Sequence, residues 1–78
     1  MLRLFAAARE AAGTARVELG GATVDDVLEA ARARFGGQFA AVLATSRIWV
    51  NGHPAELATT VSHDDEVAVL PPVSGGFN

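Results

Sequence analysis

The stretch Glu66-Val67-Ala68-Val69-Leu70-Pro71-Pro72 indicates which fold this chain adopts. Its first five residues alternate as in a β-strand, with Val67 and Val69 on one side of the sheet. Ala68 and Leu70 point to the other side. The two prolines that follow cannot donate a hydrogen bond to a neighbouring strand. We therefore predict a last strand that ends abruptly and releases a tail.

The residues before this strand contain one clear helix. Thr23 is a suitable N-cap, and Asp26 three residues later makes a shortened capping box. An apolar stripe follows at helical spacing, and Gly36-Gly37 ends the pattern. The stripe consists of Val24, Val27, Leu28, Ala31 and Phe35. We expect this helix to pack across a sheet.

Three further stretches alternate as strands do. Residues 1–5 and 15–19 precede the helix, and Arg47-Ile48-Trp49-Val50 follows it. Asn51-Gly52 comes next and is the strongest short turn signal in the chain, because both residues are suited to positive φ.

Short connecting elements complete the predicted order of helices and strands. The alanine-rich residues 6–13 can form a helical turn that their final glycine ends. A second short helical segment is expected to run from about residue 39 to residue 44. We expect His53-Pro54 to lead away from the third strand, and Leu57 and Val61 to anchor a short edge strand.

This order predicts an α+β fold, with one mixed sheet of four to five strands and one main helix packed on one face. A chain of 78 residues buries only roughly 60–65% of its unfolded surface, which suffices for one thin core. We therefore expect residues 1–78 to form a single domain with a flexible C-terminal tail from residue 71 to residue 78.

Alternation also predicts a second sheet face that the helix does not cover. If the first and last strands are neighbours, Phe5, Ala68 and Leu70 lie close together, and Trp49 lies near them. Charged residues flank this group, as they flank docking surfaces. Single exposed apolar residues are also normal on proteins. We interpret the face as a docking surface, formed by Arg3, Phe5, Arg16, Glu18, Trp49, Glu66, Ala68 and Leu70.

The composition excludes several classes of function. The chain contains no cysteine, which removes disulfides, thiolate metal sites and cysteine nucleophiles, and no lysine for Schiff-base chemistry. The net charge is −3 and the six arginines are scattered, so we do not expect nucleic acid as a partner. No apolar run approaches the ~20 residues that span a bilayer, and no signal-peptide pattern is present. We expect a soluble, cytoplasmic protein.

Few residues could support catalysis. His53 and His63 both fall in predicted turns, and the carboxylates beside His63 are too close in sequence to converge readily on one metal ion. The serines have no base at a recognisable spacing, and no glycine pair has the pattern of a phosphate-binding loop. We expect a protein that is not an enzyme and that holds no metal or cofactor.

The end of the sequence offers a different kind of chemistry. A carboxylate can be activated as an acyl adenylate, and a glycine such as Gly76 suits this role because it lacks a Cβ and can enter a narrow channel. The segment from Val73 to Asn78 reaches at most about 20 Å. This reach is enough to place its end in the pocket of another protein.

Three segments resemble the MoaD/ThiS family of ubiquitin-like sulfur carriers, and most closely MoaD, the small subunit of molybdopterin synthase. They are Phe5-Ala6-Ala7-Ala8-Arg9-Glu10, Val50-Asn51-Gly52 and, most specifically, the run from Asp65 to Gly76. The resemblance covers essentially the whole chain and implies a β-grasp, or ubiquitin-like, fold.

The resemblance also implies a sulfur-carrying cycle. An E1-like, MoeB-like enzyme adenylates Gly76, which becomes a thiocarboxylate. The tail Val73-Ser74-Gly75-Gly76 then enters a MoaE-like large synthase subunit and donates sulfur in molybdopterin (molybdenum cofactor) biosynthesis. The uncovered sheet face docks both partners. The residues expected to bind them are Phe5, Trp49, Ala68, Leu70, Pro71 and Pro72.

The chain departs from the family pattern after Gly76, where Phe77-Asn78 follows. A glycine held in a peptide bond cannot be adenylated. We therefore expect a precursor from which a protease, of a metal-dependent deubiquitinase-like kind, removes Phe77-Asn78. The alternatives are a sulfur carrier for another metabolite, a ubiquitin-like protein modifier and a non-covalent interaction module.

Overall fold

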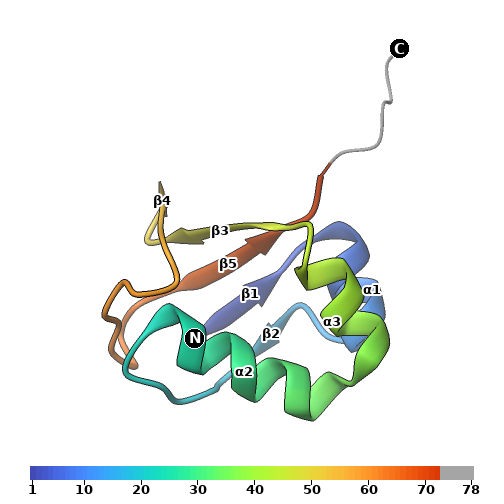
Figure 1. Cartoon of the computed structure of the whole chain (residues 1–78), viewed down its shortest axis with the longest axis horizontal. Coiled ribbons are helices and arrows are strands. Elements are labelled where there is room, and N and C mark those ends of the chain that lie inside the picture. The colour runs from blue at the N-terminus through green and yellow to red at the C-terminus, as the bar shows by residue number, and fades with distance from the viewer. Residues whose placement is uncertain (73–78) are drawn as a thin grey trace.

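The computed structural model describes residues 1–72, within which a five-stranded mixed sheet carries helices on one face (Figure 1). Of the predicted tail, Pro71 and Pro72 are described, and the residues from Val73 to Asn78 lie outside the described residues. The elements in chain order are β1 (Leu2–Leu4), α1 (Ala6–Ala12), β2 (Arg16–Val17), α2 (Val24–Phe35), α3 (Gly37–Leu43), β3 (Arg47–Val50), β4 (His53–Pro54) and β5 (Val67–Leu70). This arrangement confirms the predicted α+β fold, with α2 as the longest helix.

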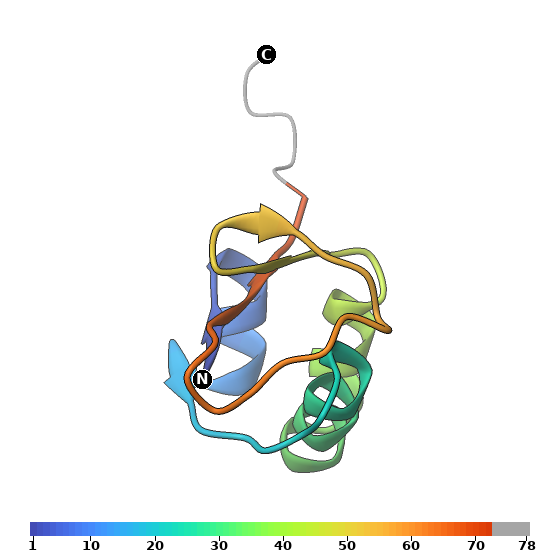
Figure 2. The same cartoon turned by 90° about the vertical axis from the view of Figure 1, so that its left-hand side faces the viewer.

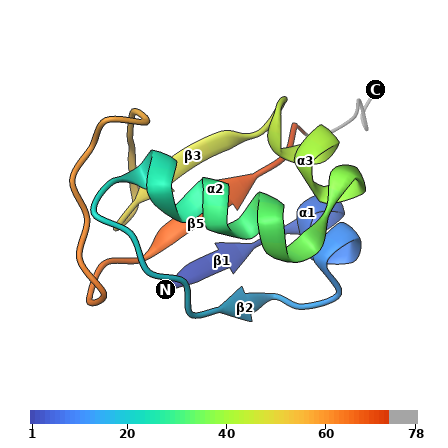
Figure 3. The ribbon, with the colours of Figure 1, turned by 60° about the horizontal axis from the view of Figure 1, so that its bottom comes forward.

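The first and last strands lie side by side in the sheet, which is the condition on which the predicted second face depended. The strand order is β2-β1-β5-β3-β4. The pairing of β1 with β5 is parallel, and the other pairings are antiparallel. Parallel neighbours need a crossover connection, and α2 runs across the sheet within it (Figure 3). In the central pair Leu2 lies beside Val67, and Leu4 lies beside Val69.

The core lies between the sheet and the helices. The alternating residues of β1 and β5 face it, and four of the five residues in the predicted helix stripe are buried in it, while Phe35 is partly buried. Phe39 of α3 is fully buried, and its ring centroid lies 5.2 Å from that of Phe35. The buried core consists of Leu2, Leu4, Ala8, Val24, Val27, Leu28, Ala31, Phe39, Leu43, Val67 and Val69.

The start of α2 is fixed from two directions. The predicted capping box is present: Thr23 Oγ1 accepts a bond of 3.2 Å from the amide of Asp26, whose carboxylate accepts one of 3.3 Å from the Thr23 amide. The loop between β4 and β5 also passes this helix end (Figure 2), where the carbonyls of Thr59 and Leu57 accept bonds from the first helical amides. These contacts satisfy donors that a helix start leaves unpaired.

Two positions favour glycine, one because of its backbone conformation and the other because of close packing. Gly13 takes a φ of 78° and ends α1, as predicted. A Cβ on Gly21 would lie 2.8 Å from the Cβ of Asp26 and 2.9 Å from the backbone nitrogen of Val27. Any side chain at position 21 would therefore force the loop or the start of α2 to shift.

The region after β3 differs from the prediction. Asn51 and Gly52 have φ values of 51° and 84°, as expected. This tight turn folds His53–Pro54 back beside β3 as β4, so the expectation that these residues lead away is wrong. The prediction that Leu57 anchors an edge strand is also wrong, because 52% of this residue is exposed. Only its carbonyl contributes, by accepting a hydrogen bond from an amide at the start of α2. Val61 packs against the core as expected.

None of the helices in the described part of the chain is both long enough and apolar enough to cross a membrane.

Candidate functional site

The sheet face opposite the helices carries most of the residues predicted to bind partners. The register sets Arg3 beside Ala68, and Ala68 beside Trp49. One step further along β5, Leu70 lies beside Arg47. These side chains are half-buried or exposed, and they alternate with buried residues in β1 and β5 and with partly buried ones in β3. The alternation in the sequence therefore places them on one open face.

Phe5 lies at one margin of this face. Its amide donates to the carbonyl of Val69 over 3.3 Å, which keeps it beside β5 after β1 has ended, and 36% of the residue is exposed. The Arg3 guanidinium lies 5.3 Å from the centre of the Phe5 ring, a cation–π contact. Arg3 also pairs with Glu66, with 3.2 Å between Nη1 and Oε2. Arg3 thus links the aromatic ring to an acidic side chain.

A groove of about 270 Å³ lies beside the point where β5 ends. Its apolar lining comes from residues at the end of β5 and just after it, and from the middle of β3. Of the described residues that line it, only Arg47 is charged. Among residues 1–72, the groove is lined by Arg47, Trp49, Leu70, Pro71 and Pro72.

The predicted partner-binding residues therefore divide into two groups. Trp49, Leu70 and the two prolines meet in the groove, whereas Phe5 lies apart from it in contact with Arg3. Ala68 lies on the face between Arg3 and Trp49. Sequence reasoning missed Arg47, although Arg47 is two residues before Trp49 and so shares its side of the strand.

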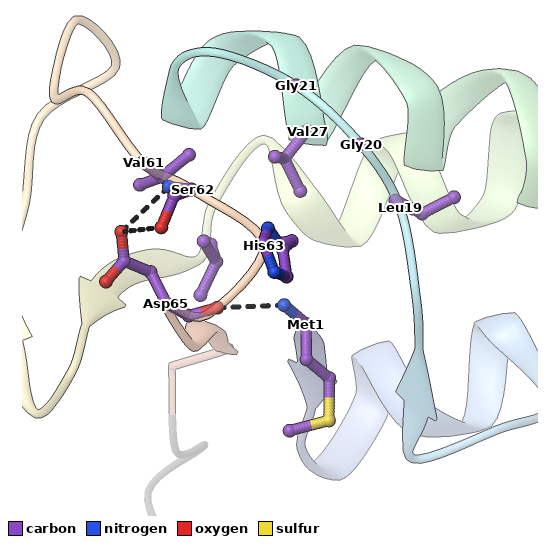
Figure 4. A pocket seen from close by; sticks show the side chains of 10 residues that line it. Met1, Leu19, Gly20, Gly21, Val27, Val61, Ser62, His63 and Asp65 are labelled. Carbon is purple, nitrogen blue, oxygen red and sulfur yellow. Dashed lines mark hydrogen bonds between the residues drawn. The ribbon is translucent and has the colours of Figure 1, made fainter.

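A second cavity, of about 160 Å³, lies at the opposite end of the central strands (Figure 4). Its polar groups bond largely to one another: the Met1 nitrogen donates to the Asp65 carbonyl over 2.8 Å, and the Asp65 carboxylate accepts from the Ser62 amide over 2.8 Å. A hydrogen bond from Asn51 is the main reason why the pKa of Asp65 is lowered, with the bond from Ser62 next. We assign this region a structural role. It is lined by Met1, Leu19, Gly20, Gly21, Val27, Val61, Ser62, His63, Asp65 and Val67.

The histidines do not form a metal centre within residues 1–72, where no three metal-ligating side chains gather. His53 lies on the exposed strand β4. The side chain of His63 is 89% exposed, and its Nε2 lies 3.3 Å from the Asp64 carboxylate.

The residues predicted to carry the chemistry lie outside the described residues. They are Val73, Ser74, Gly75 and Gly76, with Phe77 and Asn78 after them. The structure does describe the point from which they leave: β5 ends at Leu70, Pro71 is half-buried and Pro72 is exposed beside the groove.

Two solved structures are similar to this chain over nearly its whole length. The crystal structure of SAMP1 from Haloferax volcanii is 34% identical, has a TM-score of 0.80 and aligns over 96% of both chains. The solution structure of the small archaeal modifier protein 1 from Methanosarcina acetivorans is 32% identical with a TM-score of 0.84, covering 96% of this chain and 93% of that chain. A search of curated protein sequences found no match.

The model of the ThiS family matches residues 2–76. This range includes every partner-binding residue predicted above and the two terminal glycines of the tail pattern. The solved structures confirm the predicted ubiquitin-like, β-grasp fold. These comparisons do not single out MoaD, so the closer resemblance to MoaD stays a prediction. The chain belongs to the ThiS family of small ubiquitin-like proteins, which act as carriers or modifiers and not as catalysts.

Proposed function

We propose that this chain is a sulfur carrier whose reactive group is the carboxylate of Gly76. Membership of the ThiS family implies an E1-like activating enzyme as its partner. The observation that carries the proposal is the position of Gly75-Gly76, which only four residues separate from the end of a strand that is bordered by an apolar groove. One partner protein can then bind the domain at the groove and hold the Gly76 carboxylate in its active site at the same time.

The reaction needs two steps at Gly76. In the first, a carboxylate oxygen attacks the α-phosphorus of ATP, and pyrophosphate leaves. In the second, a sulfide-level nucleophile attacks the carbonyl carbon, and AMP leaves with the electrons of the acyl–oxygen bond. The product is a thiocarboxylate, and glycine favours both steps because no Cβ crowds the carbonyl.

A free carboxylate at Gly76 requires hydrolysis of the bond between Gly76 and Phe77. We propose that a processing protease performs this cleavage before activation. Because neither Phe77 nor Asn78 is needed for the chemistry that follows, a chain produced with Gly76 as its last residue should bypass the protease.

For the sulfur acceptor we propose a molybdopterin precursor bound to a MoaE-like large synthase subunit, on the strength of the resemblance of the segment from Asp65 to Gly76. A sulfur carrier for another metabolite remains the alternative of the same class. Both versions use the same activation step, so only the acceptor separates them. Transfer of labelled sulfur from the thiocarboxylated chain to the pterin precursor tests the molybdopterin version directly.

A protein modifier is the second candidate, and a specific observation favours it. The two similar structures described above are both named as SAMP1, a small archaeal modifier protein. A modifier uses the same adenylate, but an amine of a target protein displaces AMP and an isopeptide bond forms. In that case the whole domain is transferred rather than one sulfur atom.

One incubation separates these candidates. The chain ending at Gly76 is mixed with the E1-like enzyme of its host, ATP, a sulfide donor and host protein, and intact masses are measured. A product heavier by about 16 Da, from exchange of oxygen for sulfur, supports the carrier. Adducts on other proteins support the modifier. If neither forms, a non-covalent interaction module becomes the better description. The full chain ending at Asn78, incubated with the enzyme, ATP and the sulfide donor but without host protein, is the matched control and should stay unchanged.

A further inference from the structure

The described sheet has two edges, and β2 forms one of them. This strand ends the order β2-β1-β5-β3-β4, so among residues 1–72 only β1 pairs with it (Figure 3). An edge strand presents amides and carbonyls that have no partner in the sheet, and these can bind a strand of another chain. The groups that occupy each edge therefore decide whether the protein can associate through its sheet.

The backbone groups of Arg16 point away from β1. The Leu4 amide donates to the Ala15 carbonyl over 2.9 Å. The next pair along the register is Arg3 with Arg16. In an antiparallel pair of strands, residue pairs that exchange hydrogen bonds alternate with pairs that do not. The amide and the carbonyl of Arg16 consequently lie on the outer side of β2.

One side chain occupies both of these outward groups. The Thr14 hydroxyl donates to the Arg16 carbonyl over 2.9 Å and accepts from the Arg16 amide, with 3.4 Å between Oγ1 and the nitrogen. Thr14 follows directly on Gly13, whose φ of 78° turns the chain out of α1. A local bond of this kind competes with pairing to another strand. An incoming strand would have to displace the hydroxyl before it could bond to Arg16.

The opposite edge, β4, is closed in a different way. The Ala55 amide donates to the Ile48 carbonyl over 3.0 Å. The next pair along the register is Trp49 with Pro54. The same alternation puts the backbone of Pro54 on the outer side, where a proline has no amide to donate. The closure of β4 is therefore permanent, whereas the closure of β2 depends on one hydroxyl group.

The charges along the β2 edge fit a second copy of the same strand. Arg16 and Glu18 are exposed and flank Val17. If two copies of β2 pair antiparallel about Val17, Arg16 of one copy lies opposite Glu18 of the other, and symmetry forms the same pair twice. Sliding one strand by two residues would oppose two arginines or two glutamates, which is unfavourable. The charge pattern thus selects one register.

We propose that the Thr14 hydroxyl closes the β2 edge against strand addition, and that the strand it excludes is β2 of a second copy, matched through Arg16 and Glu18. The inference stands apart from the proposed function, because it involves neither Gly76 nor the groove at the end of β5. A contact through one short strand per copy is small. The two bonds of Thr14 are therefore enough to keep the wild-type chain monomeric.

Sedimentation equilibrium of the full chain over a concentration series tests the proposal through the association constant of the dimer. Thr14→Ala removes the hydroxyl and should raise that constant by at least about tenfold, since both outward groups of Arg16 become available. Thr14→Ser is the matched control, because it keeps a hydroxyl at the same position, and it should stay within about twofold of the wild type. Circular dichroism verifies that each variant is folded.

Charge substitutions separate this dimer from non-specific association. In the Thr14→Ala chain, Glu18→Arg places arginines opposite each other and should reverse the gain, although it also lowers the net negative charge that makes copies repel. Adding Arg16→Glu to that chain exchanges the two charges and should restore the dimer. Glu56→Arg makes the same change of charge at an exposed site after β4, so it should leave the dimer of the Thr14→Ala chain intact.

Amide hydrogen exchange in the wild-type chain gives a reading that needs no variant. The Arg16 amide should have a higher protection factor than the amide of Glu18, because Thr14 accepts a bond from it. Equal protection of the two amides would overturn the proposal. Wild-type association of folded Thr14→Ala would also overturn it, as would a dimer that Glu18→Arg leaves intact or that Thr14→Ser forms equally well.

Discussion

The side-chain amide of Asn51 donates a hydrogen bond of 2.9 Å to Oδ1 of Asp65, and this bond joins the β3–β4 turn to the start of β5. The Asn51 side-chain oxygen meanwhile accepts a bond of 2.9 Å from the amide of Glu66. One side chain at a turn therefore secures the entry of the strand that leads to the groove.

Replacing Asn51 separates its two roles. Asn51→Gly keeps a residue that adopts positive φ readily but removes both side-chain bonds, and it should lower the free energy of unfolding by about 1–2 kcal/mol. Asn51→Ala should cost more, because alanine also disfavours the φ of 51° found here. Urea unfolding measures both variants. Equal stability of Asn51→Gly and the wild type would show that the side-chain bonds contribute nothing.

The lowered pKa of Asp65 predicts how stability responds to acid. The bonds from Asn51 and Ser62 favour the ionised carboxylate in the folded state. The contribution of ionised Asp65 to folding stability is therefore fully present when the pH is above 3.8, the ordinary pKa of an aspartate. It is lost as the pH falls through the lower pKa that Asp65 has in the folded state. Thermal melts between neutral and strongly acidic pH should show this loss. Asp65→Asn should flatten the acid end of the curve of melting temperature against pH. The control is Asp64→Asn, which changes the exposed carboxylate of the neighbouring residue and should leave that curve nearly unchanged.

The two glycines before α2 form a matched pair for a packing test. Gly21→Ala should lower the free energy of unfolding by about 1–3 kcal/mol, since its Cβ would collide with the start of the helix. A Cβ on Gly20 meets no atom within 4 Å, so Gly20→Ala should change stability by about 0.5 kcal/mol or less. Chemical denaturation compares them, and a similar effect of both substitutions would contradict the close approach at Gly21.

Phe39 should be the most sensitive position on the short helix α3. Its side chain is the largest of those that are fully buried within residues 1–72, and Phe39→Ala should cost about 3–5 kcal/mol, a large part of the total stability of so small a protein. Leu57→Ala, at an exposed site, should cost little. Differential scanning calorimetry of the two variants distinguishes these expectations, which a mild effect of Phe39→Ala would refute.

Gly75, which precedes the proposed reactive residue Gly76, should matter for activation but not for folding. If Gly76 is activated as proposed, Gly75→Val in the form ending at Gly76 adds a β-branched side chain to a tail that has to enter the enzyme, so adenylation should slow by at least about tenfold. Pyrophosphate release with ATP and the E1-like enzyme reports the rate. Ser74→Ala, a smaller change in the same tail, serves as the control. Unaltered activation of Gly75→Val would speak against entry of the tail into a restricted channel.

Patterns that repeat along the chain made much of the fold predictable. Thr23 with Asp26 predicted the start of α2, and alternation in residues 66–70 separated the buried Val67 and Val69 from the open face. That separation in turn brought Leu70 and Trp49 together on the correct side of the sheet. Each of these signals is local, which is why one sequence sufficed.

The parts that escaped prediction depend on contacts between distant segments. A two-residue strand such as His53–Pro54 has no periodicity, so only its pairing with β3 defines it. Leu57 looked like an anchor because leucine is usually buried, yet the loop uses its carbonyl. The position of Arg47 in the groove became visible only when the register placed it beside Leu70.

The central place of β5 also has a consequence for the order of events during synthesis. β5 is the last strand in the described residues to leave the ribosome, yet it lies between β1 and β3. Until it inserts, β1 and β3 have no common neighbour, and the groove lacks the wall that Leu70 provides. Pairing across such a sequence separation is slow relative to local helix formation. A nascent or misfolded chain in which β5 has not inserted thus lacks the complete groove, so this surface exists only on finished molecules.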